Sequence, residues 1–295
     1  MTERHPSQTD VQELSALLRG WLAHRVSDDA RAWIDQQVGA IAGGERPLAL
    51  GVAIGLAPRK VGKADLDLTP AEQAAGRALR PGLDPTGWSV DQAARILLVL
   101  ASFRGDDVAF ASGIERFFAT AEIGEQIALL RGLPMFPAPE RLLPYAAEGI
   151  RSAMQPVFEA VAHRNPYPRE CFSEAQWNQM VVKTLFIGSR LAPIQGLDAR
   201  RNADLARMLL DYAAERRAAG RSISPELWRC VAPFAGDTEV TTLATILRDG
   251  TESERRGAAL ALAECQLASA KVALDTAPDL ASAARDGRLT WDSVA

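Results

Sequence analysis

Histidine and cysteine are both scarce in this chain, which contains three of each. The cysteines, Cys171, Cys230 and Cys265, lie far apart, and none belongs to a Cys-x-x-Cys pair. We therefore expect neither a disulfide framework nor a thiolate zinc site, and a reducing compartment fits best.

Long hydrophobic runs and a basic charge excess are also missing. The longest uncharged apolar run covers residues 48–57, about half of what a membrane span needs. Residues 1–10 lack the apolar centre of a signal peptide. The net charge is -4, whereas a nucleic-acid binder usually carries a basic stripe. We expect a soluble cytoplasmic protein with no nucleic-acid partner, which reaches a membrane only through another protein.

Sequence motifs of known catalytic centres are absent too. The chain has no phosphate loop and no Gly-x-Ser-x-Gly elbow. His163 precedes Cys171 by eight residues, which is formally a nucleophile pair, but two such residues in one loop are more often incidental. The doublets Asp28-Asp29 and Asp106-Asp107 precede predicted helices, where carboxylates stabilise the first turn. We expect no metal, no cofactor and no catalytic residue; enzymatic activity stays open, with the balance against it.

Helix-start signals are abundant. In a capping box, a hydroxyl residue is followed three positions later by Glu or Gln, and each side chain binds the other's backbone amide. Phe172 and Trp177 flank one such box as a hydrophobic staple, and Ser224-Pro225 with Trp228 repeats the arrangement. The boxes are Thr69 with Glu72, Ser89 with Gln92, Ser173 with Gln176, and Thr251 with Glu254.

The spacing of apolar residues predicts an all-α fold. These residues recur at intervals of three and four, and alternating valine- or isoleucine-rich runs bounded by tight turns do not occur. Residues 107–119 with 122–132, and 237–247 with 251–266, predict antiparallel helix pairs, and the last helix is alanine-rich like that of a HEAT repeat. We predict an irregular α-solenoid of antiparallel helix pairs (HEAT-like), with a compact multi-helix bundle as the alternative.

Residues 58–88 are rich in glycine, proline and aspartate and divide the chain. We predict an N-terminal helical block at residues 1–57 and a main helical body at residues 89–295. The segment between them is expected to be a connector that packs on the body.

One predicted helix carries a polar stripe in an otherwise apolar sequence. Gln176, Gln179 and Lys183 follow one another at spacings of three and four, so they share a helix face. If that face lines a groove, it offers amide donors and a cation to a polar ligand; if it faces solvent, it has no such role. Nearby arginines can bind an anion, or tie helices together through Glu215 or Asp211. The candidate ligand-binding residues are Gln176, Gln179, Lys183, Arg200, Arg201 and Arg229, and the expected structural anchors are Tyr167, Phe172, Trp177 and Trp228.

Several segments of the sequence form a distinctive combination. They are Asn165-Pro166-Tyr167-Pro168, residues 172–188, residues 205–213, Pro225-Glu226-Leu227-Trp228-Arg229 and Leu289-Thr290-Trp291-Asp292. Together these segments resemble the EboA family. The similarity runs from about residue 12 to the C-terminal end, is strongest between residues 165 and 235, and is loose in the N-terminal half.

This resemblance implies a context more than a mechanism. EboA-like proteins are encoded beside a prenyltransferase-like membrane protein, a TatD-like hydrolase, a dehydroquinate-synthase-like enzyme and a sugar-phosphate-isomerase-like protein. Such neighbours imply assembly or export of a small secondary metabolite, prenylated or not. No catalytic residue is carried over from the family.

Three hypotheses follow from the residues and the resemblance. The first is a non-enzymatic scaffold or carrier whose partners are other proteins of the metabolite pathway or the metabolite itself. The second is an enzyme with a helical cavity that acts on a polar or prenylated small molecule. The third is an oligomerisation module built on the alanine-rich C-terminal helices.

Overall fold

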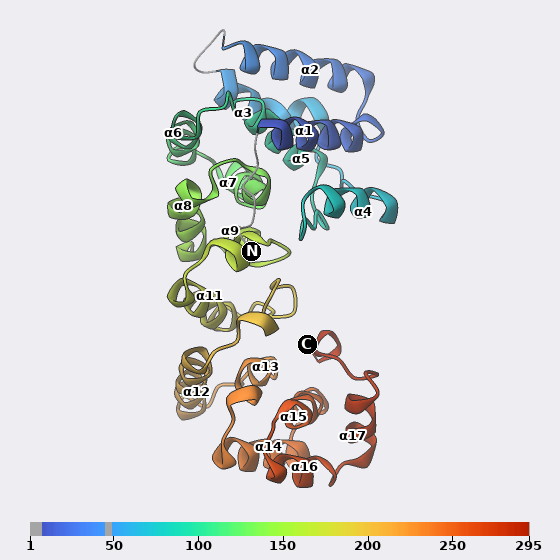
Figure 1. Ribbon diagram of the computed structural model, residues 1–295, viewed down its shortest axis with the longest axis vertical. Helices are drawn as coiled ribbons and strands as arrows, with labels where there is room; N and C mark the ends of the chain where they lie inside the picture. The colour runs from blue at the N-terminus through green and yellow to red at the C-terminus, as the bar shows by residue number, and fades with distance from the viewer. Residues whose placement is uncertain (1–7, 45–48, 295) are drawn as a thin grey trace. The chain divides into compact units, whose positions relative to one another are not determined.

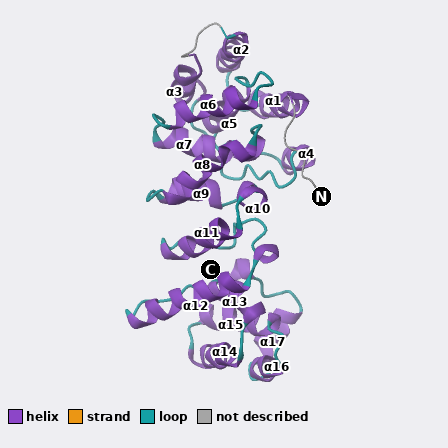
Figure 2. Ribbon diagram, turned by 60° about the vertical axis from the view of Figure 1, so that its left-hand side comes forward, coloured by secondary structure: helices purple, strands orange, loops and turns teal. Residues whose placement is uncertain are grey.

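The structure, a computed structural model, describes residues 8–44 and 49–294 (Figure 1). These residues form 17 α-helices and four short 3-10 helices, with no strand among them (Figure 2). A single antiparallel bridge joins Asp65 and Ser89. The predicted all-α fold is confirmed.

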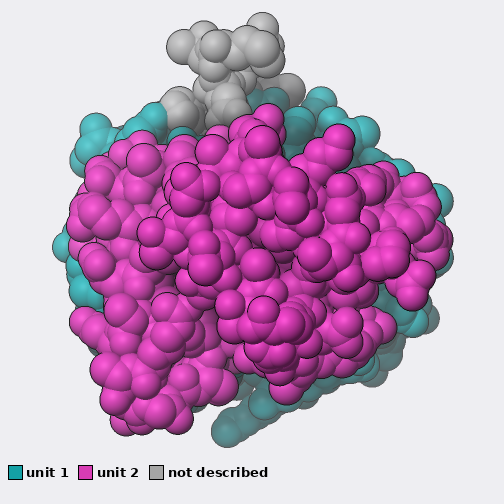
Figure 3. Space-filling model, turned by 90° about the horizontal axis from the view of Figure 1, so that it is seen from below, with its two compact units in different colours: residues 1–172 teal, residues 173–295 magenta. Residues whose placement is uncertain are grey.

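The chain divides into two compact units, Met1–Phe172 (unit 1) and Ser173–Ala295 (unit 2), coloured separately in Figure 3. Unit 1 contains α1 (Gln8–Ala23), α2 (Asp28–Gly43), α3 (Ala49–Val61), α4 (Pro70–Leu79), α5 (Val90–Leu100), α6 (Asp107–Phe118), α7 (Ile123–Gly132), η1 (Leu133–Met135), α8 (Pro139–Arg151), α9 (Gln155–Ala162) and α10 (Tyr167–Cys171). Unit 2 contains α11 (Glu174–Phe186), η2 (Asp198–Arg200), α12 (Ala203–Ala218), α13 (Leu227–Val231), η3 (Ala232–Phe234), α14 (Asp237–Asp249), α15 (Glu252–Glu264), α16 (Ala268–Leu274), α17 (Pro278–Arg285) and η4 (Trp291–Ser293).

Helix α5 is the centre of unit 1. All of its residues except Gln92 are buried, as is usual for a helix inside a core. It contacts α1, α2, α3 and α7, and α7 in turn contacts α9. In a second row, α6 contacts α8, and these two helices lie one above the other along the left edge of Figure 1.

A buried ion pair ties α5 to its neighbours. Arg95 Nη1 donates to Asp91 Oδ2 at 2.9 Å, one turn away on the same helix. The same guanidinium donates to the carbonyl of Ile54 on α3 at 3.1 Å and to that of Gly124 on α7 at 3.0 Å. One side chain therefore fixes the spacing of three helices.

In unit 2, α14 and α15 form an antiparallel pair, as predicted, and α15 also contacts α13, α16 and α17. The alanine-rich run from Gly257 to Leu262 on α15 is buried. A Cβ at Gly257 would lie 2.7 Å from Pro225 Cβ, so the absence of a side chain permits this close approach. The predicted pairing of α6 with α7 is replaced by other contacts in the structure: α6 packs on α8, and α7 packs on α5 and α9. The choice between solenoid and bundle stays a prediction.

Three of the predicted capping boxes are complete. Thr69 with Glu72, Ser173 with Gln176, and Thr251 with Glu254 each show both reciprocal bonds. In the fourth, Ser89 N donates to Gln92 Oε1 at 3.2 Å, but the Ser89 hydroxyl donates to Asp91 instead. Local sequence thus sets where these helices begin.

Helix α13 begins at Leu227, two residues after the predicted start at Pro225. The amides of Leu227 and Trp228 donate to the carbonyls of Ser224 and Pro225, so a turn precedes the helix. Glu226 in this turn is buried, and its carboxylate accepts hydrogen bonds from the backbone amides of Leu191 and Ala192, both at 2.9 Å.

Residues 58–88 belong to unit 1 and include α4. Their apolar side chains Leu66, Leu68, Leu83 and Trp88 are buried. The predicted division at residues 1–57, 58–88 and 89–295 stays a prediction about folding units.

Among the described residues, no helix combines the length and the hydrophobicity that crossing a bilayer would require.

Candidate functional site

The four predicted anchors are all buried. Tyr167 donates from its hydroxyl to the carbonyl of Pro139 and packs edge-on against Phe172, with ring centroids 6.3 Å apart. Asn165 beside it is also buried; its amide donates to the carbonyls of Leu130 and Ala160, and its oxygen accepts from Tyr167 N, each at 3.0 Å. This segment is therefore fixed by polar contacts inside unit 1.

The predicted polar stripe on α11 is not uniform. Gln176 is engaged in the capping box, where its Oε1 accepts from Ser173 N at 3.0 Å. Gln179 is exposed, whereas Lys183 is half-buried, and this burial lowers the pKa of its ammonium group. The neighbouring Asn178 is buried and exchanges side-chain hydrogen bonds with Asn202, which caps α12. Part of the stripe thus stabilises helix termini.

Arg200 lies over the Trp177 ring, with its guanidinium carbon 4.6 Å from the ring centroid. This distance suits a cation–π contact. Burial lowers the pKa of Arg200. Trp177 is fully buried, and its Nε1 finds no hydrogen-bond acceptor among the described residues.

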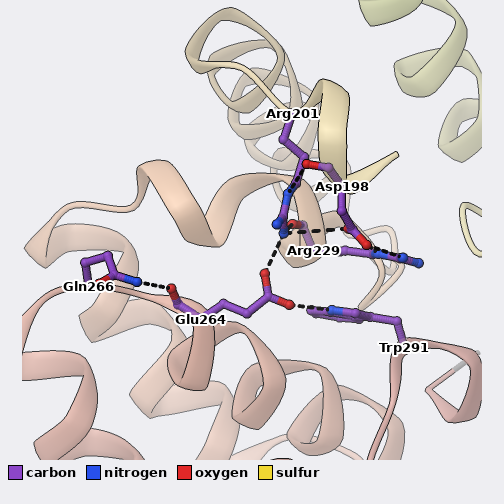
Figure 4. A network of polar contacts seen from close by, with 6 residues as sticks. All are labelled: Asp198, Arg201, Arg229, Glu264, Gln266 and Trp291. Carbon is purple, nitrogen blue, oxygen red and sulfur yellow. Dashed lines mark hydrogen bonds and ion pairs between the residues drawn. The ribbon is translucent and has the colours of Figure 1, made fainter. Parts of the chain in front are cut away.

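Arg201 and Arg229 belong to an arginine–carboxylate cluster in unit 2, defined by Asp198, Arg201, Arg229, Glu264 and Trp291 (Figure 4). Arg229 binds Asp198 through two hydrogen bonds of 2.8 and 2.7 Å. This contact, more than any other, holds the pKa of the Asp198 carboxyl below its usual range. Arg201 donates to Glu264 and to the carbonyl of Arg229, and Glu264 accepts from Trp291 Nε1 at 2.9 Å.

The cluster joins segments that are far apart in the sequence. Glu264 lies on α15 and Trp291 on η4, whereas Asp198 lies on η2. The carboxylate partners of the arginines are Asp198 and Glu264, not the Glu215 or Asp211 that sequence spacing had suggested. The structure therefore brings Arg201 and Arg229 together, and places Arg200 against Trp177. Ligand binding by the six predicted residues stays a prediction.

Sequence reasoning missed a hollow in unit 1, which we call the α6 hollow. Its volume is about 570 Å³, within the range of roughly 300–1,000 Å³ that is common for small-molecule sites. Helix α6 and its ends supply one wall, and α2, α3 and the segment after α5 supply the rest. It is lined by Ile41, Gly44, Leu50, Gly51, Ser102, Arg104, Asp106, Ala109, Phe110, Gly113, Arg116, Phe117 and Thr120.

One face of α6 builds this hollow. Asp106, Phe110, Gly113, Phe117 and Thr120 follow at intervals of four, three, four and three, the spacing of a single helix face. The Phe110 ring is held edge-on between two other phenylalanine rings, with centroids 5.6 and 6.0 Å away. A Cβ at Gly113 would meet no atom within 4 Å, so this glycine leaves space in the middle of the wall.

The described lining of the α6 hollow contains two arginines and one aspartate. Arg104 donates to the carbonyl of Ile41 at 2.8 Å, and a Cβ at Gly44 would lie 2.5 Å from its guanidinium. Gly44 ends α2 with φ +73°, so it provides both the left-handed turn and room for the arginine. Asp106 accepts from the amides of the first turn of α6 at 2.9 and 3.0 Å. Arg116 forms no ion pair with another described residue.

A second, smaller hollow of about 100 Å³ lies near the resemblance segment at Asn165. Arg131, Glu159, His163 and Arg164 contribute to its lining. Burial lowers the pKa of Arg131, and the positive charge of Arg164 lowers it further. Asp84 lies 3.6 Å from Arg164, so carboxylates offset both arginines here.

His163 and Cys171 have different surroundings. His163 lines the small hollow, whereas Cys171 forms a side-chain hydrogen bond with Tyr167. Among the described residues, no group of three or more histidine, cysteine, aspartate or glutamate side chains could hold a metal ion.

The sequence contained a signal for the α6 hollow. The face that carries Phe110, Gly113 and Phe117 has a glycine where a core-facing helix would carry an apolar side chain. Such a glycine in mid-helix costs about 1 kcal/mol relative to alanine, so it calls for a packing or functional reason. The periodicity alone did not show that the neighbouring helices leave this space unfilled.

Comparison with known proteins gives one match. The model of a protein family described as "Metabolite traffic protein EboA" matches residues 14–232. No curated protein and no solved structure matches the chain. The matched range includes the α6 hollow and both arginines of the cluster, whereas Glu264 and Trp291 lie beyond it. Because the match covers well over half of the sequence, the chain belongs to the EboA family.

Proposed function

We propose that this chain is a non-enzymatic carrier that holds a small metabolite in the α6 hollow of unit 1. The family description suggests a role in metabolite traffic, and a carrier requires a cavity of suitable size. The observation that supports the proposal most directly is the hollow of about 570 Å³.

The lining favours binding over chemistry. Within the described part of the lining, the titratable side chains are Arg104, Arg116 and Asp106, and the Asp106 carboxylate is engaged with the amides of α6. The Ser102 hydroxyl donates to the carbonyl of Val99 at 2.7 Å. General acid–base or nucleophilic catalysis needs a group whose pKa lies near the working pH or a nucleophile with an adjacent base. The described lining residues offer apolar surface, two guanidinium groups, and a carboxylate and a hydroxyl that are already engaged with backbone groups.

The proposal includes the passage of the metabolite to other proteins of its pathway. In this view the chain serves as a scaffold in the biosynthesis or export of a secondary metabolite, prenylated or not, and it touches a membrane only through a partner. A pull-down from cells of the native host, with the chain as bait, tests this part. Enrichment of the proteins encoded beside it is expected, and recovery of the bait alone would count against it.

Metabolite extraction tests the carrier function. The protein is purified from its native host, extracted with organic solvent, and analysed by mass spectrometry for bound small molecules. In the variant Gly113→Leu, the new side chain enters the hollow, and leucine favours a helix by about 0.8 kcal/mol over glycine. Gly20→Leu is the matched control, because Gly20 is an exposed helical glycine on α1 and its Cβ would also meet no atom within 4 Å.

The wild type and Gly20→Leu are expected to carry the same metabolite, and Gly113→Leu is expected to lose it while keeping its helical circular dichroism. Retention of the metabolite by Gly113→Leu would show that the metabolite binds outside the α6 hollow. The absence of any bound metabolite in the wild type would contradict the carrier function itself.

The alternative of an enzyme centred on Lys183 and the arginines has less support. The guanidinium groups of Arg201 and Arg229 already bind Asp198 and Glu264. An anionic substrate would have to displace these carboxylates. Catalytic turnover of an extracted metabolite by the purified chain, lost in Lys183→Ala, would favour this alternative.

A further inference from the structure

We infer that the ligand of the α6 hollow is an amphipathic organic anion: a molecule with an apolar ring or chain that bears one carboxylate or phosphate group. This inference rests on the proposed function, because it names the chemical class of the metabolite that the hollow carries.

The apolar part of the ligand corresponds to one wall of the hollow. Ile41, Leu50, Phe110 and Phe117 supply aliphatic and aromatic surface from α2, α3 and α6. Gly51 and Gly113 keep the wall free of side chains: the nearest atom to a Cβ at Gly51 is on Phe117 at 3.9 Å, and none lies within 4 Å of one at Gly113. Apolar surface in such a cavity favours a ligand that removes it from water.

The charged part of the ligand corresponds to the two arginines. Arg104 uses Nη2 to bind the carbonyl of Ile41, so its charge also compensates the negative end of the α2 dipole. A guanidinium group has five N–H donors, and among the described residues Arg104 donates to this one carbonyl, so other donors remain for a ligand. Arg116 lies on the exposed side of α6 and forms no ion pair with the residues that the structure describes.

The carboxylate in the lining does not cancel these charges. Asp106 accepts two backbone hydrogen bonds at the start of α6, where the helix dipole already stabilises a negative charge. Among the lining residues that the structure describes, the charged side chains are therefore Arg104 and Arg116 against Asp106, a formal charge of +1. A guanidinium group binds carboxylate or phosphate oxygens through paired hydrogen bonds, whereas a neutral or cationic ligand would leave both arginines without that gain.

Four probes separate the contributions of ring and charge. They are 2-naphthoate, 2-naphthyl phosphate, the neutral 2-naphthamide, and inorganic phosphate without a ring. Their dissociation constants are measured by isothermal titration calorimetry on the full chain at low and high salt. The variants are Arg116→Gln and Gly113→Leu, with Arg77→Gln as the matched control, because Arg77 is exposed on α4 and does not line the hollow.

One or both of the naphthyl anions are expected to bind at least about fivefold more tightly than naphthamide, the size of one charge-assisted contact at a partly exposed site. Arg116→Gln should remove most of this preference, and high salt should weaken it. Gly113→Leu should weaken all naphthyl probes, and Arg77→Gln should change none. The naphthyl anion that binds with the lower dissociation constant identifies the charged group of the ligand as carboxylate or phosphate.

The class of ligand is overturned if naphthamide binds as well as the anions, or if Arg116→Gln retains the preference. It is also overturned if inorganic phosphate alone binds as tightly as naphthyl phosphate. These results leave the carrier function standing when Gly113→Leu still abolishes binding of the extracted metabolite. If neither the probes nor a metabolite respond to Gly113→Leu, both the carrier function and the class of ligand fail.

Discussion

Replacing Asp91 by alanine is expected to destabilise unit 1 strongly. Asp91 and Arg95 are both buried, and the Asp91 carboxylate is the charged partner of a guanidinium that also binds carbonyls of α3 and α7. Removing the carboxylate leaves the arginine buried with neutral acceptors only. The Ser89 hydroxyl loses its acceptor as well.

The magnitude follows from the cost of a buried unpaired charge. Breaking a buried pair by removing one partner typically costs about 3–5 kcal/mol, a large part of the roughly 5–15 kcal/mol that stabilises a folded domain. The double variant Asp91→Ala/Arg95→Met removes the charge together with its partner. Its loss of stability should be smaller than the sum of the two single losses by about 2 kcal/mol or more.

Urea denaturation followed by circular dichroism measures these free energies, and hydrogen exchange with mass spectrometry assigns the loss to residues 1–172. The matched control is Glu148→Ala, which breaks an ion pair on α8 whose side chains are 67% and 62% exposed. Such a pair contributes at most about 1 kcal/mol. The reasoning is refuted if Asp91→Ala costs no more than Glu148→Ala, or if the two substitutions at the buried pair are additive.

Three further predictions concern single side chains. Asn165→Ala removes three hydrogen bonds to buried backbone groups, of which the Leu130 carbonyl keeps a second donor in Leu133 N, and should cost roughly 2–5 kcal/mol in urea denaturation; a loss below about 1 kcal/mol would contradict these bonds. Arg25 and the Thr69 cap hold the pKa of Glu72 at about 2. Its stabilising contribution is therefore complete above the ordinary pKa of 4.5 and is lost as the pH falls toward about 2. In Glu72→Gln, the urea midpoint should depend less on pH over that range than in the wild type. The same dependence on pH in both proteins would rule this out. Burial raises the pKa of Cys230 to about 12, so a thiol reagent at mildly alkaline pH should label it only in denaturant.

The helix starts could be predicted because their determinants lie within one turn. Thr69, Ser173 and Thr251 each find a Glu or Gln three residues ahead, and all three boxes form. A capping box needs no partner from elsewhere in the chain. By contrast, Glu226 binds amides about 35 residues away, and no pattern near Pro225 contains that contact.

The candidate site was less predictable for the same reason. The guanidinium groups of Arg201 and Arg229 were expected to bind an anion or a nearby helix, and the structure pairs them with Glu264 and Asp198. Glu264 is 63 residues from Arg201, so spacing could not identify it. The α6 hollow exists because the side chains of three helices leave the space between them unfilled. The residue pattern of one helix carries no information about that space.

By itself the sequence determined that the chain is all-α, where several helices begin, and that it resembles the family to which it belongs. These properties depend on caps, periodicity and short segments that act over a few residues. The tertiary structure alone decided that Arg95 is a buried clamp, that α6 packs on α8, and that Gly113 faces an unfilled space. These depend on which distant helices meet, because burial and charge pairing arise only when residues far apart in the chain come into contact.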